Sequence, residues 1–393
     1  MPGRRTPLGD DSVDPWTPSL TSEPVLRDSE GPSTSRNGRP AMVRRVQRVG
    51  VSSLAVTLPK VWTDSMGVHL GDSVRFRNNG QGALEIALYR DGHEPPSESQ
   101  PVTLVVTDAP TSLISNLIRS AYVSGQDRIT LTTHKGLSEI QREEIHRTAT
   151  RVAGLSVVTD HPDAITLQVS VDPTRRRLPS LIDHLTQLVQ HELSLCRRAL
   201  AQQSGVLLAP VPSIEDDLTR TYLLLCRQLF IATVDPWVGQ KIGGEDPQLR
   251  FCFHHVANAL SAVGDQVSAM ARYLQACMQS ACFSGPSCAD LGDKVARSEE
   301  LLGLTMQAFN KVSASEAHLA LSMIATTHDE FDSLMVIQTS GRRCTVLKQR
   351  LVSRLITIGE LLRGVNQETL ERAVEPGTAA RTNGQVVVAN LAD

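Results

Sequence analysis

The sequence predicts a multi-domain α+β protein whose first part holds small sheets and whose second half is all helical. At 393 residues the chain is too long for one ordinary domain. Apolar residues alternate with polar ones in short runs between 43 and 171, which is typical of half-buried strands. From about 175 to 374 they recur at helical spacing instead. These patterns divide the chain into segments 1–41, 42–92, 93–172, 173–375 and 376–393.

The two ends of the chain are polar. Segment 1–41 is rich in Pro, Ser, Thr, Gly, Arg and Asp, and it has too few apolar residues to offset the entropy of an ordered chain. Segment 376–393 is small and polar. We therefore expect a disordered tail at 1–41 and a flexible tail at 376–393.

Segment 42–92 carries a basic hairpin pattern. An apolar run ending at Val49 and a second run from Leu54 to Leu58 flank a turn that contains Gly50, Ser52 and Ser53. Pro59 ends the second run, because proline has no N–H for a strand ladder. A short helix up to Gly67 and two further strands around the Asn79-Gly80 turn complete the pattern. A unit this small cannot bury a core alone, so we expect a second copy of it.

These residues resemble the AbrB/SpoVT-type swapped-hairpin domain. The matching elements are the basic first strand, the Leu58-Pro59-Lys60 turn, the helix end at Trp62, Met66 and Gly67, and the turn at Leu70, Gly71 and Asp72. The resemblance implies that two chains interleave their hairpins into one small β-barrel, so that each chain supplies half of it, and that the basic face of this homodimer binds DNA. On this sequence it implies a DNA-binding set of Arg44, Arg45, Arg48, Ser52, Ser53 and Lys60. The alternative is a small β domain whose arginines are simply a solvated face.

Charge is distributed unevenly. The whole chain has a net charge of −3, whereas segment 42–92 holds seven Lys and Arg against four Asp and Glu, or 7 − 4 = +3. A locally basic segment on an acidic protein is typical of a DNA-contacting domain joined to a separate sensing domain. The number of phosphates it could contact is small, so DNA binding should be sensitive to salt.

Segment 93–172 predicts a small α/β domain after a linker at 93–100. The order is strand, helix, strand, helix, strand, strand, with strands near Val102–Val106, Arg128–Thr132, Ser156–Val158 and Ala164–Val171. The two helices are expected around 113–122 and over 139–152. No Gly-rich phosphate loop and no catalytic constellation accompany these elements.

The spacing in segment 173–375 predicts helices separated by breaks that contain Gly and Pro, among them Pro212, Pro236 and Pro286. The expected helices are 178–202, 214–234, 248–278, 289–312, 314–338 and 343–374. Their lengths suggest two consecutive three-helix units, which is a domain-scale duplication.

This helical half resembles the PhoU family, which has two repeated three-helix bundles. The resemblance rests on the acidic start at Glu215, Asp216 and Asp217 followed by Arg227-Gln228-Leu229, and on a second segment that ends at Asp265. The order of hairpin, α/β and helical parts matches a group of prokaryotic, largely archaeal, phosphate-uptake regulators. This resemblance implies that the protein is a transcriptional regulator of phosphate homeostasis. The alternative is an adaptor that docks on a phosphate transporter or sensor kinase, with the hairpin serving only for dimerisation.

The carboxylate pairs of the PhoU resemblance are incomplete here. That family's metal motif places Asp or Glu four residues before Asp, so that both oxygens lie on one helix face. Glu215 is followed four residues later by Thr219, and Asp265 is preceded four residues earlier by Ser261. Glu215, Asp217 and Asp265 are therefore degenerate metal candidates, and we expect no cofactor. Asp216 and Asp217 also suit the first turn of a helix, where acidic residues favour the dipole.

Other features exclude several classes of protein. The seven cysteines lack the paired spacing of a zinc site and are expected to be thiols in a reducing compartment. Neither a signal peptide nor a membrane-spanning run is evident, so we expect a cytoplasmic location without membrane insertion. Without a nucleophile elbow, P-loop, HExxH or dinucleotide fingerprint, an enzyme is not expected.

Overall fold

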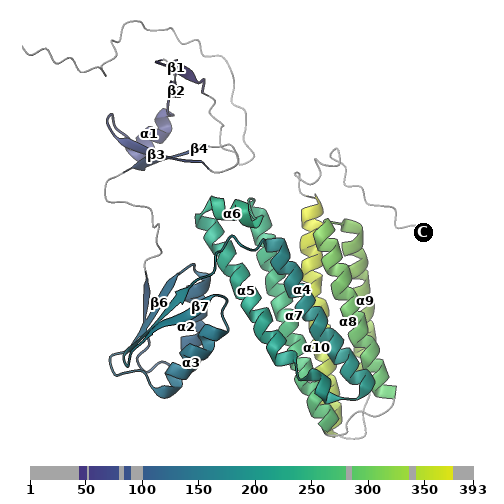
Figure 1. Ribbon diagram of the computed structural model, residues 1–393. Coiled ribbons are helices and arrows are strands. Elements are labelled where there is room, and N and C mark those ends of the chain that lie inside the picture. Colours follow the sequence, from purple (N-terminus) through teal and green to yellow (C-terminus); the bar gives the residue numbers. More distant parts are fainter. Residues whose placement is uncertain are drawn as a thin grey trace, which may run out of the picture. The chain divides into compact units, whose positions relative to one another are not determined.

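A computed structural model describes residues 44–50, 53–78, 84–89, 101–279, 286–335 and 342–374. The protein is mixed α+β and mostly helical, with small sheets, as the sequence predicts (Figure 1). Its described residues fall into two compact units: those from 44 to 75 with 86–89, and those from 76 to 85 with 101–374. The tails expected at 1–41 and 376–393 and the linker expected at 93–100 lie outside the described residues.

The hairpin segment holds two small ribbons and one helix. Strands β1 (Gln47–Val49) and β2 (Ser53–Ala55) pair antiparallel, and β3 (Ser73–Asn78) and β4 (Leu84–Tyr89) form a second two-stranded sheet. Helix α1 (Lys60–Met66) starts after Pro59 and ends at Gly67, whose φ of 63° suits a residue without a Cβ. The placement of Ser53 in the turn was wrong: Ser53 begins β2 and pairs with Val49.

The α/β layer follows the expected element order. Its elements are β5 (Val102–Val105), α2 (Thr111–Val123), β6 (Arg128–Thr132), α3 (Glu139–Thr150), β7 (Leu155–Asp160) and β8 (Ala164–Val169). The sheet order is β5-β6-β8-β7, with β5 and β6 parallel and the other pairs antiparallel. Alternate residues of β6 and β8 are buried, so one face of the sheet packs on an apolar core that also includes Ile114, Ile118 and Tyr122 of α2.

The helical half begins at Leu178. Its elements are α4 (Leu178–Gln202), the 3₁₀ turn η1 (Gly205–Leu208), α5 (Val211–Val234), α6 (Pro236–Ile242), α7 (Pro247–Gln279), α8 (Pro286–Lys311), α9 (Ala314–Met335) and α10 (Arg342–Val374). Three prolines expected in breaks instead begin helices, and one of them, Pro286, starts α8. Pro212 lies in the first turn of α5, and Pro236 starts α6 after the side chain of Asp235 accepts a hydrogen bond from the Trp237 N–H. Proline is suited to a first turn, where its missing N–H has no intrahelical partner.

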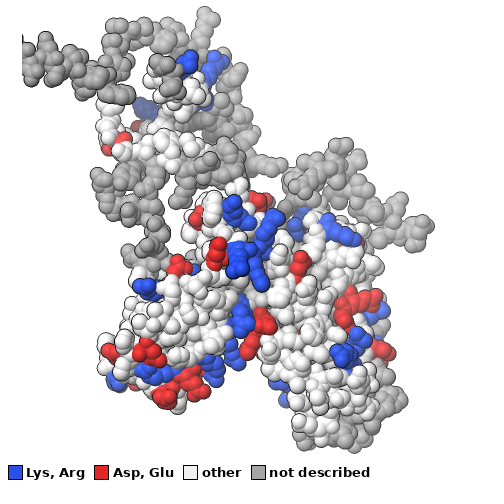
Figure 2. Space-filling view, viewed as in Figure 1, with Lys and Arg blue, Asp and Glu red and all other residues white. Residues whose placement is uncertain are grey.

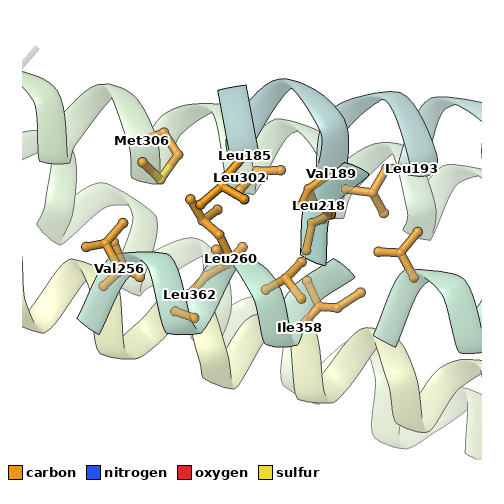
Figure 3. Packing of buried hydrophobic residues seen from close by; sticks show 14 of the residues in the cluster. Leu185, Val189, Leu193, Leu218, Val256, Leu260, Leu302, Met306, Ile358 and Leu362 are labelled. Atoms are coloured by element: carbon orange, nitrogen blue, oxygen red, sulfur yellow. The ribbon is translucent and has the colours of Figure 1, made fainter. Parts of the chain in front are cut away.

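One apolar core runs through the long helices. Helices α4, α5 and α7 contact one another, as do α8, α9 and α10, and the α4–α8 and α7–α10 contacts join the two sets. Figure 3 shows the side chains that interdigitate, among them Leu185 of α4, Leu260 of α7, Leu302 of α8 and Leu362 of α10. Helices α5 and α7 approach closely at Gly264, where a Cβ would lie 2.6 Å from Cδ1 of Leu218.

A fully buried arginine connects the helical half to the α/β layer. Arg227 of α5 donates from Nη1 to the carbonyl oxygens of Tyr122 (2.6 Å) and Gln126 (3.0 Å), and from Nη2 to that of Gly125 (3.3 Å). It also pairs with the Asp127 carboxylate, and its guanidinium lies 4.9 Å from the centre of the Tyr122 ring. These carbonyls belong to the end of α2 and the turn that follows it. The guanidinium thus donates to carbonyls at the end of the helix and in its turn; that of Tyr122 also accepts the Gly125 N–H at 3.1 Å.

The next residue secures the connection to α4. Gln228 is fully buried, and its Nε2 donates to the carbonyl oxygens of Pro173 (2.7 Å) and Arg176 (2.9 Å) in the segment between β8 and α4. Arg227 and Gln228 together hold two parts of the chain against α5: the turn after α2 and the segment that follows β8. These contacts explain why two polar residues lie within the apolar run from Leu223 to Ile231 of α5.

The Arg227 fork predicts a large effect of a change that keeps the charge. We expect Arg227→Lys to lower the free energy of unfolding by about 3 kcal/mol, since an ammonium group cannot serve all of these carbonyls and the rest would be buried without a donor. Urea unfolding followed by circular dichroism measures this. Arg220→Lys is the matched control: Arg220 lies on the same helix and bonds the Thr150 carbonyl at 3.2 Å from a partly exposed position, so a cost of about 0.5 kcal/mol is expected. Equal costs at the two positions would contradict this account.

Candidate nucleic-acid interface

The four basic side chains expected to contact DNA are exposed. Arg44, Arg45 and Arg48 lie in and before β1, and Lys60 is the first residue of α1. None of the four forms an ion pair with a carboxylate in the described part of the chain. Figure 2 shows blue side chains over the β1–β2 ribbon. Their charge is therefore available to an anionic partner.

The two strands do not present the whole predicted set on one face. Paired residues of an antiparallel ribbon share a face, and the register pairs Arg48 with Leu54 and Val49 with Ser53. Arg48 and Ser53 therefore project from opposite faces of the ribbon. Ser52 lies outside the described residues.

Large apolar side chains of the same segment are exposed. Leu54 is 72% exposed and Val61 is 75% exposed, and none of the side chains described between 44 and 89 is buried. Others that are exposed are Val46, Val49, Val56, Met66, Leu70, Phe76 and Leu84. Apolar surface of this extent marks an interaction site in a folded protein.

A second group of arginines lies in the other unit. Arg175, Arg176 and Arg177 are consecutive and exposed in the segment that leads into α4. With Arg220 they line hollows of about 450 and 420 Å³ beside α4 and α5. Figure 2 shows blue side chains gathered between the α/β layer and the helices. The sequence reasoning did not single out this group, although three consecutive arginines were visible.

The degenerate metal candidates separate into two places. Glu215 of α5 forms an ion pair with Arg272 of α7 at 3.5 Å, and it lies close enough to Asp265 to raise the pKa of that carboxyl, after the larger effect of desolvation. Asp217 instead pairs with Arg220 on its own helix. Within the described residues, no group of three or more His, Cys, Asp or Glu side chains could hold a metal ion. An arginine thus occupies the vicinity where the PhoU resemblance would place metal ligands.

Sequence reasoning missed a buried carboxyl beside this pair. Glu192 of α4 is fully buried, accepts a hydrogen bond from Ser268 Oγ at 3.2 Å, and leaves its Oε2 without a partner. Burial, and then the charges of Glu215 and Asp265, raise its pKa to about 8. Its spacing could have predicted this burial, because Glu192 follows Val189 by three residues and so lies on the apolar face of α4.

A further polar cluster joins α7 to α10. Glu368 accepts hydrogen bonds from the Cys252 thiol (2.7 Å) and from His255, whose Nδ1 is 3.1 Å from its Oε2. Cys252 is buried, as are Cys196, Cys226 and Cys277.

No protein-family model, curated protein or solved structure matches this chain. Among the described residues, no helix is both long and apolar enough to cross a membrane.

The raised pKa of Glu192 predicts a pH-dependent stability. The unfolded chain releases this proton near pH 4.5, whereas the folded protein keeps it up to about pH 8. Stability should therefore fall as pH rises through that window, by up to about 1.4 kcal/mol per pH unit. We expect Glu192→Gln to be more stable than the wild type at pH 8 by at least about 1 kcal/mol, with a smaller difference at pH 5. Thermal unfolding at both pH values measures this, with the exposed Glu371→Gln as control; a gain that is independent of pH would contradict it.

Proposed function

We propose that this protein is a DNA-binding transcriptional regulator that dimerises through its N-terminal hairpin. The observation that carries the proposal is the coincidence, on one small segment, of basic side chains without carboxylate partners and of exposed large apolar side chains. The apolar residues need a covering surface, and a second copy of the segment supplies one. The arginines then double in number over one face, where they contact phosphates and base edges.

In the proposed dimer the β1–β2 ribbon must both cover its apolar side chains and leave its basic side chains open to DNA. The face of Val49 and Ser53 and the face of Arg48 and Leu54 each mix polar and apolar residues. Interleaving of two ribbons covers Leu54 while the longer Arg48 side chain reaches past the contact to solvent or DNA, because an arginine stem packs on apolar surface while its charged head stays outside. This arrangement accounts for an arginine and a leucine that share one face.

The helical half relays the signal in this proposal. The PhoU resemblance and the order of the parts support a link to phosphate uptake, with the helices contacting a protein partner such as a transporter or sensor kinase. The proposed relay uses no metal. It is consistent with the Arg272–Glu215 ion pair and with the single proton on buried Glu192, which leave few anionic oxygens for a cation.

The DNA contact is tested by removing the hairpin arginines from the full chain. We expect Arg44→Gln, Arg45→Gln and Arg48→Gln together to weaken binding to a random-sequence duplex at low ionic strength by at least about tenfold, and to lower the slope of log K against log salt concentration by about 2 to 5, since each lost phosphate contact removes about 0.9. Fluorescence anisotropy across a salt series measures both quantities.

The matched control removes the same charge elsewhere. Arg175→Gln, Arg176→Gln and Arg177→Gln change three arginines of the second unit, and we expect them to leave affinity and salt slope close to those of the wild type. If only this control loses binding, the interface lies on the helical unit. If the wild type dimerises but shifts no duplex at low salt, the adaptor function replaces the regulator.

Dimerisation is tested by adding a charge to the apolar surface. We expect Leu54→Glu to convert a dimer into monomers at micromolar concentration, because the carboxylate would be desolvated in the contact. Sedimentation velocity measures the state. Thr57→Glu, an exposed polar position in the same segment, should remain dimeric. A wild-type protein that is monomeric at every concentration would contradict the shared barrel.

The phosphate link has its own test. Genome-wide mapping of bound DNA in cells grown with and without phosphate should place the protein near phosphate-transport genes, with occupancy that changes with phosphate. Binding far from such genes and unmoved by phosphate would remove this part of the proposal and leave the DNA contact standing.

A further inference from the structure

A groove of about 680 Å³ lies where the α/β layer meets the helices. Helix α2 forms one wall with Arg119 and Val123, and α5 and α7 form the rest with residues that include Leu229, Phe230 and Phe251. The volume falls within the roughly 300 to 1,000 Å³ that is usual for small-molecule sites, and such sites are common at domain junctions.

The walls of the groove are held in place. The Arg227 fork fixes the end of α2 against α5, and Ile231 Cγ1 lies 3.4 Å from the position of a Cβ at Gly125. The groove therefore exists before any ligand arrives, which lowers the entropic cost of binding.

The inside of the groove is apolar. Leu223 and Cys226 lie at its base and are 7% and 6% exposed, and burial raises the pKa of the Cys226 thiol to about 11. Phe230 and Phe251 remain 45% and 66% exposed, although large aromatic side chains are normally covered. The structure thus leaves an apolar surface that a ligand of matching character would cover.

The groove is lined by two arginines and one histidine. They are Arg119 on α2 and, one helical turn apart on α7, Arg250 and His254; no Asp or Glu lines it. None of the three pairs with a carboxylate among the described residues, and Arg119 Nε is buried without a hydrogen-bond partner. Arg250 is oriented by hydrogen bonds from Nη1 to the carbonyl oxygens of Gly244 (2.7 Å) and Glu245 (3.3 Å). An anionic group in the groove would therefore find nitrogen donors on both the α2 wall and the α7 wall.

We propose that this groove binds a small amphipathic anion, in which an apolar body packs on Val123, Leu229 and Phe251 and one carboxylate or similar acid group contacts Arg119 and His254. The site is independent of the hairpin and goes beyond the proposed DNA contact. It gives the helical unit a place to sense a metabolite, and it lies beside the junction that Arg227 holds.

Decanoate is the probe, titrated into the full-length protein by calorimetry. We expect saturable binding, and we expect Arg119→Gln with His254→Gln to raise the Kd by about tenfold or more, since charge-assisted hydrogen bonds are lost. Arg250 is left unchanged because it also supports the turn before α7. Arg363→Gln, on the outer part of α10, is the matched control and should leave the Kd unchanged.

A second variant tests the space rather than the charge. Ser120 is exposed on α2 and lines the groove, so Ser120→Phe fills it without disturbing a core position. We expect this variant to keep the wild-type thermal midpoint and to lose decanoate binding. Decyltrimethylammonium, which has the same chain with a cationic head, should bind at least about tenfold more weakly than decanoate.

Several results would overturn the proposal. If none of the groove variants changes the affinity for decanoate, the probe binds another apolar surface. Equal affinity for decanoate and for the cationic probe would show that the basic side chains do not select the ligand. If an acidic amphipathic peptide binds and decanoate does not, the groove is a protein-docking surface instead.

Discussion

The helical unit depends on one buried guanidinium. Arg227 satisfies the carbonyl oxygens that end α2 and the turn after it, while Gln228 satisfies the segment that leads into α4. A buried charge is costly unless it is paired and hydrogen-bonded. Sliding of α2 along α5 would remove the carbonyl and carboxylate partners of the two Arg227 Nη atoms, so this contact favours one relative position of the two helices. The apolar groove and the hollows lined by arginines both lie along this junction. Their geometry follows from it.

The hairpin segment lacks such a buried contact, since none of its described side chains is buried. Short ribbons and one helix of seven residues expose valine, leucine and phenylalanine side chains to solvent. Such a segment gains stability only by covering that surface, and a symmetric second copy is the simplest cover. Its basic side chains carry no such cost, because arginine and lysine heads remain hydrated. The proposed assembly and the proposed DNA contact therefore depend on different side chains of one segment, so each can be tested without the other.

The acidic group between α4, α5 and α7 is Glu192, Glu215 and Asp265. Its negative charge is reduced from within the protein, by the Arg272–Glu215 ion pair and by retention of a proton on Glu192. A proton and a guanidinium thus lower the negative charge of this acidic group without a metal ion. The price is a stability that depends on pH, which a metal-loaded cluster would not share in the same form.

The sequence by itself determined what depends on neighbours along the chain. Apolar spacing located the six long helices within a few residues, and alternation located the strands of the α/β layer, because helix and strand periods are local properties. Proline was misread as a break at Pro212, Pro236 and Pro286, each of which lies in the first turn of a helix. The basic hairpin residues were named from sequence, but only strand register divided Arg48 from Ser53. Tertiary structure alone decided that Arg227 and Glu192 are buried, and it alone assembled the groove from α2, α5 and α7. Burial of a polar side chain depends on what distant segments place around it, which no local pattern records.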